Sequence, residues 1–452
     1  MKTERDVIPK PLQQGGQGQA LYGLLQQLEQ SQWWPAERML AEQLQQLVRL
    51  LGYAASHSPF YRQHLDGVDP ARLDAETLLD IPLLTRQQLQ EENAQIDCVP
   101  IPEGHGGAEE ARTSGSTGFP VCFRKTALTS TVWNAINMRE QLWHARHYDG
   151  VSASIRWHGE AIGLAPDGLA FPDWGLPLNL FHTSGPSYFM NSSVDVAAQI
   201  RWLQRLRPRY LMTHPSNLRA LLAQLIRDES VLLGLTQVRT IGESIDDDLR
   251  DAVRDQLGAE LVDLYSSEEL GYMALQCPQQ DHYHVQSESV LLEVLRDDGS
   301  PCALHEPGRI VASSLRNYAT PLIRYEIGDY GEWGEPCGCG RGLPVLKRIH
   351  GRVRNMLLHP DGSAHWPNFG FRKFMEVAAI RQFQLVQHAL DRIEFRLVVD
   401  APLSVEQEAR LREILTQNLG HPFEIDISYH EALARSASGK FEDFLSRLTP
   451  AR

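Results

Sequence analysis

Thr113-Ser114-Gly115-Ser116-Thr117-Gly118-Phe119-Pro120 is the stretch that decides how this chain is interpreted, and Arg124, Lys125 and Thr126 follow it closely. Glycine lets backbone N–H groups turn inward and hydroxyls add donors without bulk, so such a run can wrap a polyphosphate. The run lacks the Gly-Lys-Ser/Thr ending of P-loop NTPases and the glycine spacing of dinucleotide-binding folds. It predicts a phosphate loop of another kind, with a flexible Ser/Gly surface turn as the alternative.

Outward from this loop, composition and periodicity divide the chain into three regions. Residues 1–95 are rich in Gln, Leu, Ala and Glu with apolar residues at helical spacing, which predicts a packed helical layer. Residues 96–354 alternate strand-like runs with amphipathic helices and then change to a strand meander with Asp-Gly and Pro-Gly turns. Residues 355–452 read strand, strand, helix, strand, as in a separate small domain.

The predicted fold class is therefore α/β. A large multi-layer N-terminal domain with parallel-type sheets and a β-rich subdomain is expected, followed by a small α+β C-terminal domain.

The composition narrows the possible partners and compartment. A net charge of −14 argues against nucleic acid, because binding phosphate backbones needs clustered Lys and Arg. The amino terminus lacks the apolar core of a signal peptide, and no apolar run reaches the ~20 residues that span a bilayer, so a cytoplasmic protein without a membrane partner is expected. The sequence leaves the oligomeric state open, a homodimer included.

Ordered motifs extend the phosphate-loop interpretation along the chain. They read TSGSTGFPVCFRKT at 113–126, DLYSSEELG at 263–271, IRYEIGDYGE at 323–332, HGRVRN at 350–355 and ASGKFEDF at 437–444. In this order they resemble the adenylate-forming superfamily, and within it the phenylacetate–CoA ligase-like branch. HSPFYR at 57–62 and IPLLTR at 81–86 resemble the amino-terminal helical region of the same branch, so the resemblance covers nearly the whole chain.

This resemblance implies ATP-dependent activation of a carboxylic acid to an acyl-adenylate, with release of pyrophosphate and then thioester formation with coenzyme A. Transfer to a carrier-protein thiol or to an amine in a biosynthetic pathway is the alternative. A non-catalytic nucleotide-binding relative is a third reading, which would tolerate loss of the motif residues that this chain keeps.

The resemblance also assigns roles around the phosphates. Lys440 matches the family's mobile lysine, which bridges the carboxylate and the α-phosphate, where a point-like ammonium on a long stem is suited. Glu269 matches the acid that holds Mg²⁺, although Glu268 beside it leaves either carboxylate as the ligand. Asp329 matches the acceptor of the ribose hydroxyls, with Arg352 opposite it, and a turn-forming Asp is the alternative.

Further positions follow from the same resemblance. Tyr265 and the Gly242-Glu243 pair resemble the adenine-side wall of the nucleotide pocket, while a core tyrosine is the alternative for Tyr265. Arg354 stands where the family places the hinge of a mobile C-terminal lid domain, followed here by Asn355.

The acyl pocket is expected between residues 155 and 245, the part that departs most from phenylacetate ligases. Trp157, Trp174, Phe181 and His182 suggest an aromatic lining for an aryl or arylacetic acid. Aromatic residues at such spacing are more often core, which stays the alternative.

Cysteines and histidines form a second candidate site. Cys277 and His284 lie in CPQQDHYH and Cys337 and Cys339 in CGCGRGLP, and three thiolates with one imidazole are a common closed set for structural zinc. Some members of the resembled branch carry a similar site, and the resemblance favours His284 over His282. Four unconnected residues are the alternative, because Cys-x-Cys is less specific than Cys-x-x-Cys.

Overall fold

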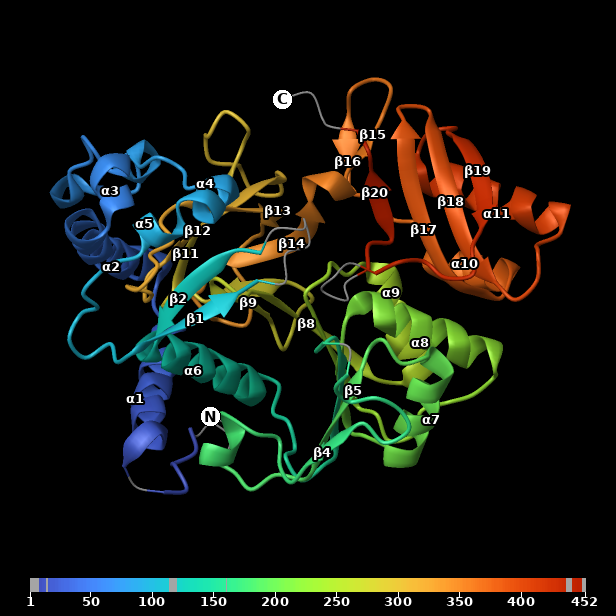
Figure 1. The fold of residues 1–452 in the computed structure, drawn as a ribbon, viewed down its shortest axis with the longest axis horizontal. Helices are drawn as coiled ribbons and strands as arrows, with labels where there is room; N and C mark the ends of the chain where they lie inside the picture. Colours follow the sequence, from blue (N-terminus) through green and yellow to red (C-terminus); the bar gives the residue numbers. More distant parts are fainter. Residues whose placement is uncertain (1–7, 14, 114–119, 160, 436–440, 449–452) are drawn as a thin grey trace. The chain divides into compact units, whose positions relative to one another are not determined.

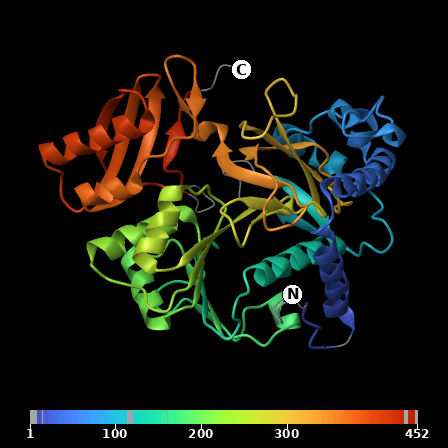
Figure 2. The same ribbon diagram turned by 180° about the vertical axis from the view of Figure 1, so that it is seen from behind.

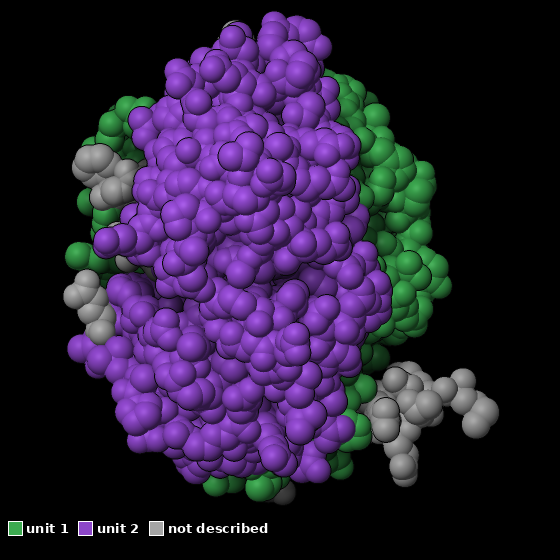
Figure 3. Space-filling view, turned by 90° about the vertical axis from the view of Figure 1, so that its right-hand side faces the viewer, with its two compact units in different colours: residues 1–148, 174–184, 264–349 green, residues 149–173, 185–263, 350–452 purple. Residues whose placement is uncertain are grey.

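The computed structural model describes residues 8–13, 15–113, 120–159, 161–435 and 441–448. The predicted loop residues Ser114 to Gly118 and the predicted catalytic Lys440 lie outside this described part. The chain forms two compact units, coloured separately in Figure 3: Met1–Tyr148, Trp174–Ser184 and Leu264–Ile349 in the first, and Asp149–Asp173, Gly185–Asp263 and His350–Arg452 in the second. Among the described residues, no helix combines the length and apolar character needed to cross a bilayer.

The helices expected over residues 1–95 are present in the first unit. In the second of them the apolar positions Leu47, Leu50, Leu51 and Ala54 recur on one face and are buried, as helical spacing predicts. Ser58 and Thr85 cap the helices that follow them with side-chain hydrogen bonds to backbone N–H groups. The helices are α1 (Gly16–Ser31), α2 (Ala36–His57), α3 (Pro59–His64), α4 (Arg86–Glu91), α5 (Asn93–Ile96) and α6 (Ala127–Trp143).

The strands of the first unit form a hairpin and an antiparallel sheet (Figure 1). The hairpin pairs β1 (Ala108–Arg112) with β2 (Cys122–Thr126). The sheet has the order β11-β12-β13-β14-β10-β9-β8, so the predicted strand meander is confirmed as β11 to β13. Its strands are β8 (Glu260–Ser267), β9 (Gly271–Gln276), β10 (Tyr283–Val285), β11 (Val290–Leu295), β12 (Gly308–Ser314), β13 (Tyr325–Trp333) and β14 (Val345–Arg352).

The second unit contains the predicted alternation of strands and helices. Strands β7, β6, β3 and β5 are neighbours in a parallel arrangement, and β4 adds an antiparallel edge. Buried apolar residues of the strands and of the helices form one core, which confirms the βαβ interpretation. The elements are β3 (Ser152–Arg156), β4 (Leu169–Phe171), β5 (Ser187–Asn191), α7 (Val196–Leu206), β6 (Tyr210–Thr213), α8 (Pro215–Arg227), β7 (Gln237–Ile241) and α9 (Asp247–Leu257).

The C-terminal part of the second unit is an α+β layer. Its sheet has the order β19-β18-β17-β20, and α11 covers one face of it (Figure 2). The predicted strands and helix are confirmed, whereas α10 and β20 were not foreseen because both are short. The elements are β15 (Leu357–Leu358), β16 (Ala364–His365), α10 (Phe371–Val377), β17 (Ile380–Ala389), β18 (Arg392–Val399), α11 (Val405–Leu419), β19 (Glu424–Tyr429) and β20 (Phe444–Ser446).

Candidate functional site

Paired strands flank the segment predicted to bind phosphate. Thr113 donates its backbone N–H to the carbonyl of Val121 at 2.9 Å, and its Oγ1 accepts from the Val121 N–H at 2.9 Å. Behind β2, the Arg124 N–H donates to Thr320 Oγ1 at 2.8 Å, and Thr320 in turn donates to Asp97. These contacts tie the hairpin that carries Thr113 to the rest of the first unit.

Tyr265 and Asp329 meet although they lie on different strands. The Tyr265 hydroxyl, at the end of β8, donates to Asp329 Oδ2 on β13 at 3.0 Å. Tyr265 is buried and Asp329 is half-buried, so the tyrosine supports the carboxylate from the interior. A carboxylate in such a position is chemically suited to accept hydrogen bonds from two neighbouring hydroxyls.

Glu269 is the buried member of the Glu268-Glu269 pair. Glu268 is exposed, whereas Glu269 is 4% exposed and lies 3.3 Å from Nη1 of Arg86. The same Nη1 is 3.4 Å from the Tyr325 hydroxyl on β13. The structure therefore directs Glu269, not Glu268, into the group formed with β13.

These contacts join into one constellation within the first unit. Tyr265 and Glu269 belong to the end of β8 and the turn after it, and Tyr325 and Asp329 both belong to β13. Arg86 was not among the predicted site residues, although its position in IPLLTR at 81–86 carried the resemblance. The sequence did not predict that the Arg86 guanidinium lies next to the buried Glu269 carboxylate, because 183 positions separate the two residues.

In the second unit, Gly242 and Glu243 follow β7. Gly242 has φ +80°, a conformation that favours glycine, and it turns the chain so that Glu243 faces the start of α8. Glu243 Oε2 accepts the Ser216 N–H at 2.7 Å, and Oε1 lies 3.0 Å from Ser216 Oγ. Its Oε1 also accepts the Phe441 N–H at 3.1 Å.

The predicted hinge region is held by the end of the chain. Arg354 donates from Nε at 2.9 Å and from Nη2 at 2.5 Å to Glu442 Oε1. Asn355 donates to the Phe444 carbonyl at 2.7 Å, and the Arg352 carbonyl accepts from Trp366 Nε1 at 3.2 Å. The residues around the proposed pivot therefore make hydrogen bonds with the C-terminal α+β layer.

Part of the predicted acyl pocket gathers as an aromatic group. The ring of Tyr148 lies 4.6 Å from that of His182 and 5.7 Å from that of Trp174, measured between centroids. Burial lowers the pKa of His182, so a neutral imidazole is favoured. Phe181 is buried, and Trp157 is half-buried in the second unit.

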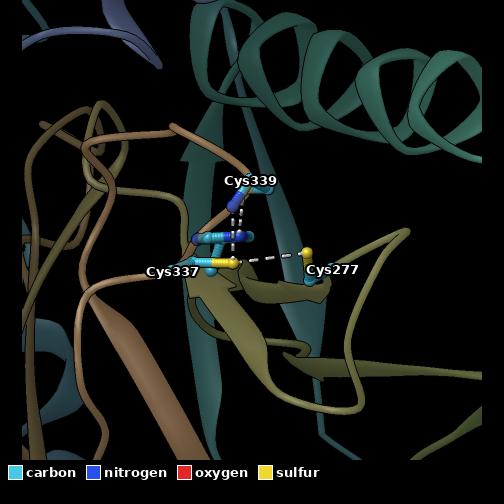
Figure 4. Close-up of side chains that lie close together, drawn as sticks. Cys277, Cys337 and Cys339 are labelled. Carbon is cyan, nitrogen blue, oxygen red and sulfur yellow. Dashed lines mark hydrogen bonds between the residues drawn. The ribbon is translucent and has the colours of Figure 1, made fainter.

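The four predicted metal ligands converge in the first unit. The ligand atoms of Cys277, His284, Cys337 and Cys339 all lie within 4.8 Å of one another. Sγ of Cys277 is 3.8 Å from Sγ of Cys337, and Sγ of Cys339 is 3.4 Å from Nε2 of His284 (Figure 4). His282, which precedes β10 directly, is not part of this group.

The surroundings of this cluster change the pKa values of its candidate ligands and fix the orientation of His284. Burial, with a lesser effect of Arg341, lowers the pKa of His284 to about 4, so its imidazole is neutral. Its Nδ1 lies 3.4 Å from the Leu343 carbonyl, which leaves Nε2 for a metal. Burial raises the pKa of Cys277, and that of Cys337 to about 12, so both thiols would lose their protons only to a metal.

The loop that carries two of the cysteines is fastened to the helices. The Gly342 N–H donates to the Gln32 carbonyl at 2.8 Å, and a Cβ on Gly342 would lie 1.7 Å from the Trp34 carbonyl oxygen. The Arg341 guanidinium lies 4.3 Å from the Trp143 ring centroid and donates to Gln32 at 3.0 Å. Sequence reasoning missed Arg341, whose position after CGCG gave no functional signal.

Comparisons with known proteins agree with this geometry. Residues 369–446 match the family described as the CapK C-terminal domain. The chain is 26% identical to a phenylacetate–coenzyme A ligase of Thermus thermophilus over 345 residues, covering 72% of each protein. It is 25% identical to that of Escherichia coli over 343 residues, covering 71% of this chain and 73% of the relative. Among solved structures, a 2-hydroxyisobutyryl-CoA ligase is similar with a TM-score of 0.72 at 18% identity, covering 91% of this chain and 90% of that one.

Proposed function

We propose that this chain is an AMP-forming acid–coenzyme A ligase of the adenylate-forming superfamily, because phenylacetate–coenzyme A ligases are among its homologues and its fold is similar to that of a coenzyme A ligase. One observation carries the proposal. The buried Glu269 and the half-buried Asp329 belong to one constellation, in which Tyr265 and Arg86 orient them. Two oriented carboxylates of this kind suit a metal-bound phosphate and a ribose, respectively.

In the first half-reaction, a carboxylate oxygen of the acid attacks the α-phosphorus of ATP, and the bond to pyrophosphate breaks. Glu269 would hold Mg²⁺, which would neutralise charge on the phosphates. Asp329 would accept hydrogen bonds from the ribose hydroxyls, and Thr113 begins the segment proposed to cradle the phosphates. Lys440 is proposed to compensate the two anions that meet at the reacting phosphorus.

In the second half-reaction, the thiolate of coenzyme A attacks the acyl carbon and AMP leaves. The residues near Arg354 are proposed as the pivot at which the C-terminal layer turns between the half-reactions. A carrier-protein thiol or an amine as the acceptor is distinguished from coenzyme A by the experiment below.

Cys277, His284, Cys337 and Cys339 are proposed to bind one structural Zn²⁺. The convergence of their ligand atoms supports the site, and a neutral imidazole with three thiolates is a set that zinc prefers. Because protein ligands would fill all four positions, the ion would stabilise the fold and would not activate water.

The acid is proposed to be an aryl or arylacetic acid. The aromatic group of Tyr148, Trp174 and His182, whose rings meet edge-to-face or tilted, supports a flat substrate, because such rings can pack against planar apolar groups. Phe181 of the first unit is kept as a candidate for the same pocket, and Trp157 of the second unit stays a separate candidate for substrate contact.

The test is a screen of carboxylic acids for ATP-dependent pyrophosphate release, with and without coenzyme A. Phenylacetate, benzoate and 2-hydroxyisobutyrate are the first members of the panel, with acetate as the small aliphatic control. We expect an aryl acid to give release, and coenzyme A to increase turnover and yield a thioester. Release that coenzyme A leaves unchanged would favour another acceptor, and no release with any acid would refute the proposed function.

A further inference from the structure

Glu243 connects two parts of the second unit that are far apart in sequence. Its carboxylate accepts from Ser216, at the start of α8, through both the backbone N–H and the hydroxyl. It also accepts the backbone N–H of Phe441, which follows Lys440 directly in the sequence. Both oxygens are therefore engaged by the protein, so the Glu243 side chain fastens the C-terminal layer to the loop after β7.

A buried ion-pair group reinforces this contact. Arg219, which is 7% exposed on α8, lies 2.8 Å from Asp246 through Nη2 and 3.2 Å from Asp443 through Nε. Asp246 also caps α9 by accepting the Leu249 N–H at 2.8 Å. The guanidinium therefore joins a fixed helix cap to the residue that precedes β20.

Buried apolar residues of both parts also pack together. The core that contains Leu218 and Leu222 of α8 continues into Phe371 and Phe383 of the C-terminal layer. A small cavity lies beside them, lined by residues that include Ser216, Arg219, Arg435 and Asp443. The hydrogen bonds and ion pairs therefore give direction to a contact that apolar packing also holds.

We propose that Glu243 is a positioning residue for adenylation, which docks the C-terminal layer by holding Phe441 against the start of α8. This inference rests on the proposed function, because it assigns the docked arrangement to the first half-reaction. Phe441 follows the proposed catalytic lysine, and Gly242-Glu243 stands at the predicted nucleotide pocket. Docking at Glu243 therefore holds Phe441 at the loop where the nucleotide is expected.

This role separates the two half-reactions. Loss of the dock weakens only the step that needs the docked arrangement, since the thioester step uses another arrangement in the proposed cycle. A residue that merely stabilises the fold would lower both rates together. A split between the half-reactions is therefore a readout that a structural role would not produce.

The experiment compares Glu243→Gln and Glu243→Asp with the wild type. Glu243→Gln keeps the shape of the side chain and removes its charge. Glu243→Asp keeps the charge but shortens the side chain by one methylene, which moves the carboxylate oxygens away from Ser216 and Phe441. Adenylation is measured with phenylacetate as exchange of labelled pyrophosphate into ATP, and thioester formation from supplied phenylacetyl-adenylate and coenzyme A. We expect adenylation to fall about tenfold in each variant, with the thioester rate within about twofold of the wild type.

Asp255→Asn is the matched control. Asp255 lies 2.8 Å from Arg372 Nη2 in the same part of the unit, but both side chains are more than a third exposed. We expect this variant to leave both rates unchanged, because exposed ion pairs contribute little.

The outcomes separate the two proposals. No exchange in the wild type with phenylacetate or any other acid of the panel refutes the proposed function. Wild-type exchange together with equal losses in both half-reactions, or with no loss in folded Glu243 variants, overturns the positioning role alone. Thermal melting of each variant establishes folding, and Glu243→Asp carries the test if Glu243→Gln does not fold.

Discussion

The metal-ligand cluster of the first unit and the docking contact of the second both join residues distant in sequence, but they are held in opposite ways. The cluster brings three sulfur atoms and one imidazole nitrogen within 4.8 Å of one another, and a backbone hydrogen bond to Gln32 holds its loop. The docking contact joins Glu243 to the Phe441 N–H and Arg219 to Asp443, beside a small cavity.

The difference teaches which region serves stability and which serves the reaction cycle. A closed set of ligands gains its energy only when all members are in place, so it acts as a permanent cross-link. The docking contact is proposed instead to form and open during the reaction cycle, so its residues are expected to act on one half-reaction. Damage to the first should unfold the protein, and damage to the second should alter one step.

The largest expected effect comes from Cys337→Ser. Loss of one thiolate should release the metal and destabilise the protein by about 3–5 kcal/mol, as for other lost metal cross-links. Elemental analysis should find about one zinc per wild-type chain and less in the variant, and the melting temperature should fall. Cys122→Ser, at a half-buried cysteine outside the cluster, is the control. A metal-free wild type as stable as the metal-loaded protein would contradict this prediction.

Lys440→Ala should leave stability unchanged and impair chemistry. Because its charge is proposed to act mainly in the transition state, acid-dependent pyrophosphate release should fall at least ~10²-fold, about 2.7 kcal/mol. ATP affinity, measured by calorimetry, should stay within a few-fold. Lys347→Ala, at a half-exposed lysine of β14, serves as the control. Collapse of ATP affinity with surviving turnover at saturation would show the assigned role to be wrong.

Arg86→Gln should show whether Mg²⁺ can replace the Arg86 guanidinium beside Glu269. Removing the guanidinium leaves the buried Glu269 without its partner at 3.3 Å and should cost about 1–2 kcal/mol. Mg²⁺, which Glu269 is proposed to bind, should therefore raise the melting temperature of this variant more than that of the wild type. Arg86→Lys keeps the charge and should respond like the wild type. Equal shifts in all three proteins would argue against Glu269 as the magnesium ligand.

The smallest expected effect is a pH dependence of docking. Burial raises the pKa of Asp443 to about 7, with Glu243 and Asp246 adding to the rise and Arg219 and Arg435 opposing it. In the undocked layer this pKa should return toward ~3.9, so docking takes up a proton between about pH 4 and 7. Docking should be strongest at the acidic end and weaken as the pH rises to about 7, with no further change above it from this group.

The ratio of adenylation to thioester formation should therefore fall a few-fold between about pH 5.5 and 7 in the wild type. Asp443→Asn, which cannot ionise, should remove this dependence, and Asp255→Asn should keep it. A pH profile that Asp443→Asn leaves unchanged would assign the dependence to another group.

Much of the fold was predictable because its elements are locally encoded. The helix α7 and the strand β18 follow the apolar periods of 3.6 and 2, respectively, which depend on neighbours only a few residues away. Short elements such as α10 escaped prediction because seven residues carry too little periodic signal against tertiary packing.

The sequence by itself determined the chemical types at the sites: a glycine- and hydroxyl-rich loop, paired acids, and three cysteines with a histidine. Only the tertiary structure decided which members act together. It buried Glu269 and exposed Glu268, gathered His284 without His282, and set Arg86 and Tyr325 beside Glu269. The physical reason is that the burial and the neighbours of a side chain depend on segments that the fold brings together, and these segments lie far apart in the chain, as the 183 positions between Arg86 and Glu269 show.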